Sequence, residues 1–201
     1  MVAMTLEGER AIEYKFIKDK LPRGNGTVLE LGPEPRGKVA MLAIERGWHV
    51  VAVGLERVQR THPRLTFIHG DFVTLDIAGR FDWVLCVSTI EHFGLAGRYG
   101  IEVARPDHDL VAMQRLRGMT AGTMLLTMPV GVDTVFKPWH RVYGEKRLPR
   151  LFEGWRIIEQ HFRAKVSSNV YEAVDRDTAL AQMPTVKPFY YALGLFVLEV
   201  A

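Results

Sequence analysis

Residues 28–39 read Val-Leu-Glu-Leu-Gly-Pro-Glu-Pro-Arg-Gly-Lys-Val, a short apolar run that ends in a glycine and proline turn. The pattern predicts a strand, a loop and then the start of a helix. Such a loop gathers free backbone N–H groups and the positive end of the helix dipole at one point, where an anionic or carboxylate-bearing molecule can bind. Glu30, two residues before Gly32, could reach an amino group on the same ligand. Together these features predict a site for an amino-acid-like group.

The segment Glu30-Leu-Gly32, followed by Gly37, resembles motif I of the class I S-adenosylmethionine (SAM) dependent methyltransferases. The resemblance implies that SAM is the cofactor and that Glu30, Gly32 and Gly37 hold its methionine part. The chain departs from the family's usual acid-x-Gly-x-Gly-x-Gly because Pro33 and Pro35 follow Gly32, and prolines stiffen a loop and remove N–H donors. An ordinary turn between a strand and a helix is the alternative.

Two further segments extend the resemblance. An acid near the end of the second strand usually binds the ribose hydroxyls in this kind of fold. Here the strand predicted at residues 49–53 is followed by Gly54, so we assign the ribose to Glu56. The later Gly-Asp-Phe segment resembles motif III, which implies that Asp71 and Phe72 bind the adenine. As structural alternatives, Glu56 would be a surface charge and Asp71 a helix N-cap.

Polar residues follow the strand predicted at residues 81–87, whose nearly all-apolar sequence is typical of a parallel strand covered on both faces. Ligands of open α/β sheets lie beyond the carboxyl ends of the strands. We therefore assign Ser88 to the cofactor and place Glu91 and His92 at the transferred group, with Glu91 orienting a histidine. The Asn-Pro-Pro-Tyr and Pro-Cys sequences of many base-modifying methyltransferases are absent, which argues against those nucleic-acid subclasses.

The stretch at residues 128–148 begins Met-Pro-Val-Gly and continues to His-Arg-Val-Tyr. Together with the segments after the fourth strand, it resembles a little-characterised methyltransferase-like family over residues 12–160. Members of that family are presumed to modify sugars or surface glycans, which implies a small-molecule or sugar acceptor. His140 is the strongest candidate for a catalytic base, because an imidazole near neutral pKa can take a hydroxyl proton during methyl transfer. The alternative is a buried histidine that holds its loop by hydrogen bonds.

Residues 97–109 are polar, contain glycine and show no clear period, which predicts an active-site loop. Asp107, His108 and Asp109 have the chemistry of metal ligands, but adjacent residues rarely converge on one ion. We expect no metal and assign Asp107 or Asp109 to capping of the helix that follows.

The composition is that of a globular protein. The chain has 201 residues, 48% of them apolar, which suits one well-buried domain over residues 1–201. A lone cysteine, Cys86, excludes an intrachain disulfide, and no apolar run approaches the roughly 20 residues that span a bilayer. We expect a cytoplasmic protein with no membrane segment; the scarcity of Asn and Gln beside abundant Arg and Glu is also reported for heat-adapted proteins. The formal charge of +3 is mild, and one basic cluster is only weak evidence for nucleic acid binding: Arg141, Lys146, Arg147 and Arg150.

The order of the predicted elements indicates an α/β, Rossmann-like fold with a seven-stranded, mostly parallel sheet, a C-terminal antiparallel strand and helices on both faces. Residues 165–189, between the last two predicted strands, would form a lid or a homodimer contact. We expect a SAM-dependent methyltransferase that acts on an oxygen of a small-molecule or sugar acceptor. The alternatives are a non-catalytic member of the fold or a partner subunit, and an RNA or protein methyltransferase whose basic cluster forms one surface. A nicotinamide-binding oxidoreductase ranks last, because Gly-x-Gly-x-x-Gly is absent.

Overall fold

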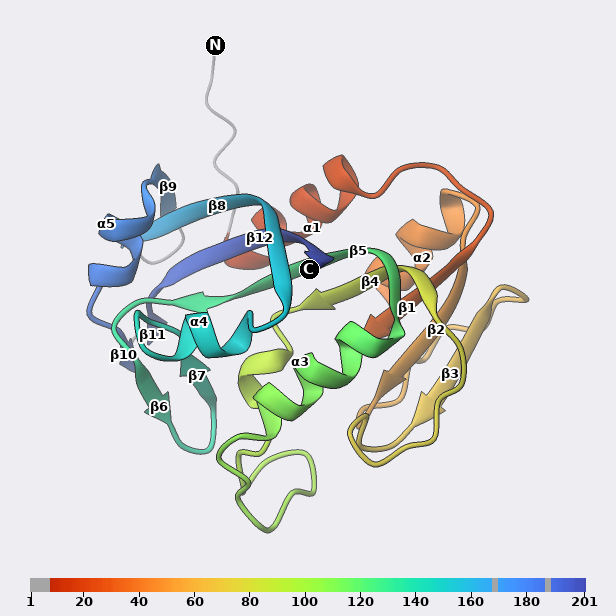
Figure 1. Ribbon diagram of the computed structural model, residues 1–201, viewed down its shortest axis with the longest axis horizontal. Helices are drawn as coiled ribbons and strands as arrows, with labels where there is room; N and C mark the ends of the chain where they lie inside the picture. Colours follow the sequence, from red (N-terminus) through yellow and green to blue (C-terminus); the bar gives the residue numbers. More distant parts are fainter. Residues whose placement is uncertain (1–7, 168–169, 187–188) are drawn as a thin grey trace.

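A computed structural model describes residues 8–167, 170–186 and 189–201. Its centre is an eight-stranded sheet in the order β3-β2-β1-β4-β5-β12-β8-β9 (Figure 1). The first five strands along the chain pair in parallel: β1 (Thr27–Leu31), β2 (His49–Gly54), β3 (Leu65–His69), β4 (Phe81–Val87) and β5 (Thr120–Val130). The remaining three pair antiparallel: β12 (Ala192–Val200), β8 (Trp155–Ser167) and β9 (Val170–Val174). The predicted α/β, Rossmann-like fold is confirmed.

The sheet has one strand more than the seven predicted. The difference arises because β8 extends to Ser167, into the excursion predicted at residues 165–189, and β9 pairs with this extension. Much of β8 is exposed and polar, so the sequence there lacks the apolar run that marks the buried strands. The excursion predicted at residues 165–189 therefore begins as sheet.

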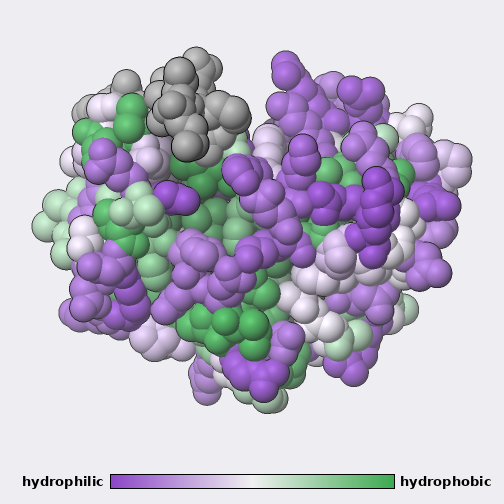
Figure 2. Space-filling view, turned by 90° about the horizontal axis from the view of Figure 1, so that it is seen from above, coloured by the Kyte–Doolittle hydropathy of each residue, from purple (hydrophilic) through white to green (hydrophobic). Residues whose placement is uncertain are grey.

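Helices cover both faces of the sheet, as predicted, and each face has its own core (Figure 1). On one face, α1 (Gly8–Lys20) and α2 (Lys38–Glu45) contribute the apolar side chains. On the other, the core takes residues from α3 (His108–Met119), α4 (Arg147–Leu151) and α5 (Arg176–Ala181). Hydrophilic side chains dominate much of the face seen from above, with apolar ones gathered near its middle (Figure 2).

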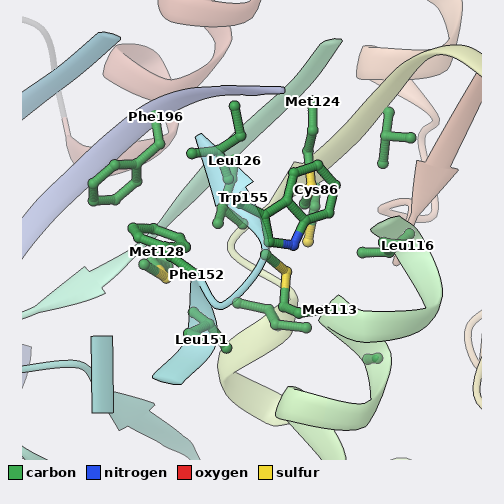
Figure 3. Close-up of a cluster of buried hydrophobic side chains, with 14 of the residues drawn as sticks. Cys86, Met113, Leu116, Met124, Leu126, Met128, Leu151, Phe152, Trp155 and Phe196 are labelled. Carbon is green, nitrogen blue, oxygen red and sulfur yellow. The ribbon is translucent and has the colours of Figure 1, made fainter. Parts of the chain in front are cut away.

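The core under α3 and α4 combines leucine, aromatic and sulfur-containing side chains (Figure 3). The ring of Phe196 on β12 meets those of Phe152 and Phe162 edge-on, with centroids 4.9 and 5.7 Å apart. Cys86 on β4 lies in the same cluster and is a buried free thiol. This packing joins β4, β5 and β12 to the helices on this face of the sheet.

The chain reverses its direction of travel across the sheet between β1 and β4. From β1 it builds outward through β2 and β3, and it then returns to place β4 on the other side of β1. Ligands in such sheets bind beyond the carboxyl ends of the strands at this switch point. The topology thus predicts a crevice after Leu31 and Val87, the last residues of β1 and β4.

Smaller elements surround that crevice. A 3-10 turn, η1 (Ile90–His92), follows β4, and a hairpin of β6 (Thr134–Phe136) and β7 (His140–Val142) follows β5. Within the excursion, α5 is the predicted helix, and β10 (Thr185–Val186) pairs with β11 (Phe189–Tyr190). Residues 168–169 and 187–188 of the excursion lie outside the described part of the chain, and its role as a lid or dimer contact stays a prediction. None of the helices in the described residues is long and apolar enough to cross a membrane.

Candidate functional site

A cavity opens at the switch point of the sheet and encloses about 1090 Å³, counting the part open to solvent. Residues from β1, β2 and β4 and from the loops after them form its wall. Most of the residues predicted for the cofactor, and one predicted for catalysis, line it: Glu30, Gly32, Glu56, Asp71, Phe72, Ser88 and His92. The cavity wall does not include Gly37, Glu91 or His140.

The first turn depends on two glycines with positive φ. Gly32, with φ of 66°, donates its N–H to Val53 O at 2.8 Å, and a Cβ there would lie 2.2 Å from the Thr89 side chain. Gly37, with φ of 61°, starts α2. Glu34, between the two prolines, accepts from the Lys38 N–H at 3.1 Å. The Glu34 carboxylate thus accepts from one of the free N–H groups at the start of α2.

Steric crowding favours a glycine, Gly54, at the end of β2. A Cβ at Gly54 would stand 3.0 Å from Pro33 Cδ, so the proline in the first turn crowds the position where the family usually has its acid. Glu56 lies beyond this point, is exposed, and borders the cavity. The two departures from the methyltransferase pattern are therefore coupled.

Asp71 does not cap a helix, contrary to the structural alternative considered for it. Its Oδ1 accepts from the Val73 N–H at 3.0 Å within a turn, and its Oδ2 lies 3.1 Å from His108 Nε2. His108 also lines the cavity, stacking at 6.2 Å on the Phe93 ring. The sequence suggested only metal binding for His108, and its pairing with Asp71 had no local signal.

Glu30 is a buried carboxyl group at the cavity wall. It is 3% exposed, and its Oε2 has no hydrogen-bond partner among the described residues. Burial, with a smaller contribution from Glu34, raises the pKa of Glu30 to about 8, against a hydrogen bond from the Ala40 amide. A buried polar atom without a partner is costly. The carboxyl is therefore suited to a donor brought by a ligand.

His92 is held in one tautomer. Its Nδ1 lies 2.5 Å from the carbonyl oxygen of Trp139, and because a carbonyl only accepts, Nδ1 carries the proton and Nε2 is left with a lone pair. Burial lowers the pKa of His92 to about 4, so the ring is neutral at physiological pH. Glu91, buried beside it, has Oε1 3.8 Å from His92 Nε2, and burial raises the pKa of Glu91 to about 8.

His140 lies outside the cavity wall, in a group of aromatic rings. It is 6% exposed, and its ring centroid lies 5.6, 5.2 and 5.1 Å from those of Phe136, Phe189 and Tyr191. Burial lowers the pKa of His140. Its Nε2 has no hydrogen-bond partner among the described residues. This position matches the alternative of a buried histidine, although ring packing, not hydrogen bonding, holds it.

The helix α1 contributes residues that the sequence did not single out. Arg10 and Tyr14 line the cavity, and Arg10 pairs with the fully buried Glu13 at 3.0 Å. Glu13 accepts hydrogen bonds from Ser88 Oγ and, at 2.7 Å, from Thr127 Oγ1. An acidic residue on the apolar face of an amphipathic helix was the available signal. These contacts fasten α1 to the ends of β4 and β5, beside the cavity.

The predicted basic cluster does not form an open basic surface. Arg141 is 3% exposed and donates to the backbone carbonyls of Phe93 and, at 3.0 Å, Pro106. Arg147 and Arg150 pair with acidic residues of the 97–109 loop and α3. Of the four basic residues only Lys146 and Arg150 are exposed, so they do not form the single basic surface that would favour an RNA or protein substrate.

The aspartates before α3 act as ion-pair partners and make no side-chain cap. Asp107 occupies the predicted N-cap position but makes no side-chain hydrogen bond to the helix, so the position was predicted correctly and the side-chain cap was not. It lies 3.2 Å from Arg147, and the fully buried Asp109 receives Arg147 Nε at 2.9 Å. In the described residues, no group of three or more His, Cys, Asp and Glu side chains is arranged to hold a metal ion.

Replacing Tyr143 by phenylalanine tests how firmly this network is held. The Tyr143 hydroxyl donates to Asp109 Oδ2 at 3.0 Å inside the core, and removing a buried hydrogen bond of this kind costs about 1–2 kcal/mol. We expect urea unfolding to show that loss for Tyr143→Phe. Tyr190→Phe is the matched control, since its hydroxyl makes no hydrogen bond within the described residues. Equal stability of the two variants would contradict the role of Tyr143.

One protein-family model matches most of the chain. The model described as Caenorhabditis protein of unknown function, DUF268, matches residues 41–183. The chain belongs to this family. A search of curated protein sequences finds no match for this DUF268 chain.

Solved structures with the same fold are methyltransferases. One is the 1,6-didemethyltoxoflavin-N1-methyltransferase of Burkholderia thailandensis with 1,6-didemethyltoxoflavin and S-adenosylhomocysteine bound, at 17% identity and a TM-score of 0.62 over 94% of this chain and 80% of that one. Another is the N-methyltransferase NodS of Bradyrhizobium japonicum, at 14% identity and a TM-score of 0.63 over 96% of both chains. A third is the CcbJ methyltransferase of Streptomyces caelestis, at 17% identity and a TM-score of 0.56 over 94% of both. At these identities the likeness establishes the fold of the DUF268 chain.

Proposed function

We propose that the protein is a SAM-dependent methyltransferase that acts on a small-molecule or sugar acceptor, most simply on a hydroxyl oxygen. The observation that carries the proposal is the meeting of the motif residues on one cavity at the switch point, with the unpartnered Glu30 carboxyl beside the Gly32 turn. The methyltransferase fold of the solved relatives supports it, and two of the three named above are N-methyltransferases. A single buried, unpaired cysteine also suits a reducing, cytoplasmic setting.

The residues on the cavity wall fit the parts of SAM. Glu30 would receive the ammonium group of the methionine end, beside the N–H groups of the first turn. Glu56 would bind the ribose hydroxyls from the loop after β2. Asp71 and Phe72 would bind the adenine, while Ser88 lies at the end of β4 beside the reacting centre.

SAM supplies an electrophilic methyl group on sulfur. The protein's part is to hold the acceptor oxygen in line with that group and to exclude water. The chain's own contribution would be a proton acceptor: His92 Nε2, the nitrogen left free by the bond to the Trp139 carbonyl, would take the proton of the acceptor hydroxyl. A neutral imidazole here suits an oxygen acceptor, because a hydroxyl must lose its proton whereas a neutral amine attacks without prior help.

The first test is calorimetric titration with SAM, S-adenosylhomocysteine and, as a control, NAD. We expect micromolar binding of both adenosyl ligands and none of NAD, because the cavity offers a carboxyl for the methionine ammonium but no Gly-x-Gly-x-x-Gly turn for a pyrophosphate. Absence of adenosyl binding would contradict the proposal. It would favour a non-catalytic member of the fold, with the crowding between Pro33 and Gly54 as its structural reason.

A further inference from the structure

At the mouth of the cavity, the 97–101 loop meets the hairpin of β6 and β7. The Arg98 guanidinium lies 4.5 Å from the Tyr99 ring centroid and 5.6 Å from that of Trp139. A Cβ at Gly97 would lie 3.2 Å from Pro138, which shows how close the loop comes to the hairpin. The same hairpin segment binds His92 through the Trp139 carbonyl. The loop, the hairpin and the proposed base therefore share one corner of the site.

Aromatic faces surround this corner. The Tyr99 ring lies 5.8 Å from the His92 ring. Trp139 and Phe189 lie outside the cavity wall but next to Arg98 and Tyr99, which line it: Trp139 is 44% exposed, and the Phe189 ring, 38% exposed, lies 6.3 Å from it. Large aromatic rings beside a cavity offer flat apolar faces on which a sugar or aromatic ring can stack.

Arg98 differs from the other arginines around the site. Arg10 is paired with Glu13, and Arg147 with Asp109. In the described part of the chain, no carboxylate is paired with Arg98, which instead stacks on Tyr99 and Trp139 and borders the cavity. A guanidinium fixed by stacking still presents its N–H edge, which matches a carboxylate or phosphate in two parallel hydrogen bonds.

We propose that Arg98, Tyr99 and Trp139 form the acceptor subsite, and that the acceptor is a small hydroxylated ring compound with a carboxylate or phosphate group. The inference rests on the proposed methyl transfer. The acceptor's ring stacks on Trp139 and Tyr99, and its anionic group pairs with Arg98. Its hydroxyl then faces His92, whose ring is in contact with Tyr99 and whose backbone partner is Trp139.

The test uses charge-matched probes on protein saturated with S-adenosylhomocysteine. Saturation-transfer NMR compares 3-hydroxybenzoate with 3-hydroxybenzamide, glucuronate with glucose, and glucose 6-phosphate with glucose. We expect at least one anionic probe to bind about tenfold more tightly than its neutral partner, as one charge-assisted pair implies. Arg98→Ala removes that preference, and Trp139→Ala weakens both members of the pair. As the control, Arg105→Ala replaces an exposed arginine of the longer 97–109 loop and leaves the preference unchanged.

Three results would overturn the subsite: equal binding of charged and neutral probes, no binding of any probe, or loss of S-adenosylhomocysteine affinity in Arg98→Ala. The last would assign Arg98 to the cofactor. Failure of wild-type protein to bind S-adenosylhomocysteine at all would be seen before any probe is added. That result contradicts the proposed function itself, so the two failures are distinguishable.

Discussion

Replacing Glu30 by glutamine is expected to weaken S-adenosylhomocysteine binding about 100-fold, because a charge-assisted hydrogen bond in a buried site contributes roughly 1.5–3 kcal/mol. Glu30 borders the cavity, and its buried Oε2 atom has no partner in the described residues. Glutamine fills the same space but presents no charge to an ammonium group. Calorimetric titration measures the change, and Glu45→Gln, an exposed carboxyl on α2, is the control. An unchanged affinity would mean that the first turn does not hold the methionine end.

The same residue makes a second, thermodynamic prediction. Burial raises the pKa of Glu30 from 4.5 to about 8, so between these pH values the folded protein binds more protons than the unfolded chain. Its stability without ligand therefore falls as pH rises through this window. Glu30→Gln removes this loss, and at pH 8 the ligand-free variant is expected to melt above the wild type. An ammonium that recruits the ionised carboxylate also makes binding at pH 7 release close to one proton, which calorimetry in buffers of different ionisation enthalpy detects.

The buried strands of the sheet could be predicted from the sequence. Residues 81–87 form β4 over the predicted range, because a strand covered on both faces is a continuous apolar run. Parallel strands also bring their carboxyl ends together, so residues far apart in sequence, such as Glu30, Asp71 and His92, could be expected at one cavity. The extension of β8 could not, because its exposed residues follow no buried pattern.

The parts of the site that the sequence did not reveal depend on contacts between distant segments. Glu13 of α1 reaches Ser88 and Thr127 across the sheet, and His108 of α3 reaches Asp71. An acidic residue on the apolar face of α1 was the only local signal for the first contact, and the second has none. Arg141 was expected at a surface because arginine usually is, yet backbone carbonyls of the 90–106 segment bury it. The sequence thus singled out Arg141 by its charge but did not show which groups it binds.

Replacing His92 by glutamine is expected to lower kcat by a factor of about 10²–10⁴ with little change in the affinity for S-adenosylhomocysteine, the usual contribution of a positioned general base. Glutamine can still donate to the Trp139 carbonyl, so the hairpin stays in place, but it cannot accept the hydroxyl proton. The pKa of His92 is lowered to about 4 by burial, and a base is inactive once protonated. The part of kcat that depends on His92 is therefore expected to stay constant from pH 7 to pH 5 and to fall as the pH drops through about 4.

His140 provides the decisive comparison, because it is buried outside the cavity wall, whereas His92 is partly exposed and borders the cavity. His140→Phe preserves the ring packing against Phe189 and Tyr191, and we expect kcat to stay within a few-fold of the wild type. Long-range proton–nitrogen NMR adds a readout that needs no acceptor: His92 is expected to show the Nδ1–H tautomer, fixed by the Trp139 carbonyl. If His140→Phe abolishes turnover while His92→Gln retains it, the base is His140 and the ring group around it must open during the reaction. If NMR instead shows neutral His92 with its proton on Nε2, His92 is not the base, since its lone pair would then face the hairpin and not the acceptor.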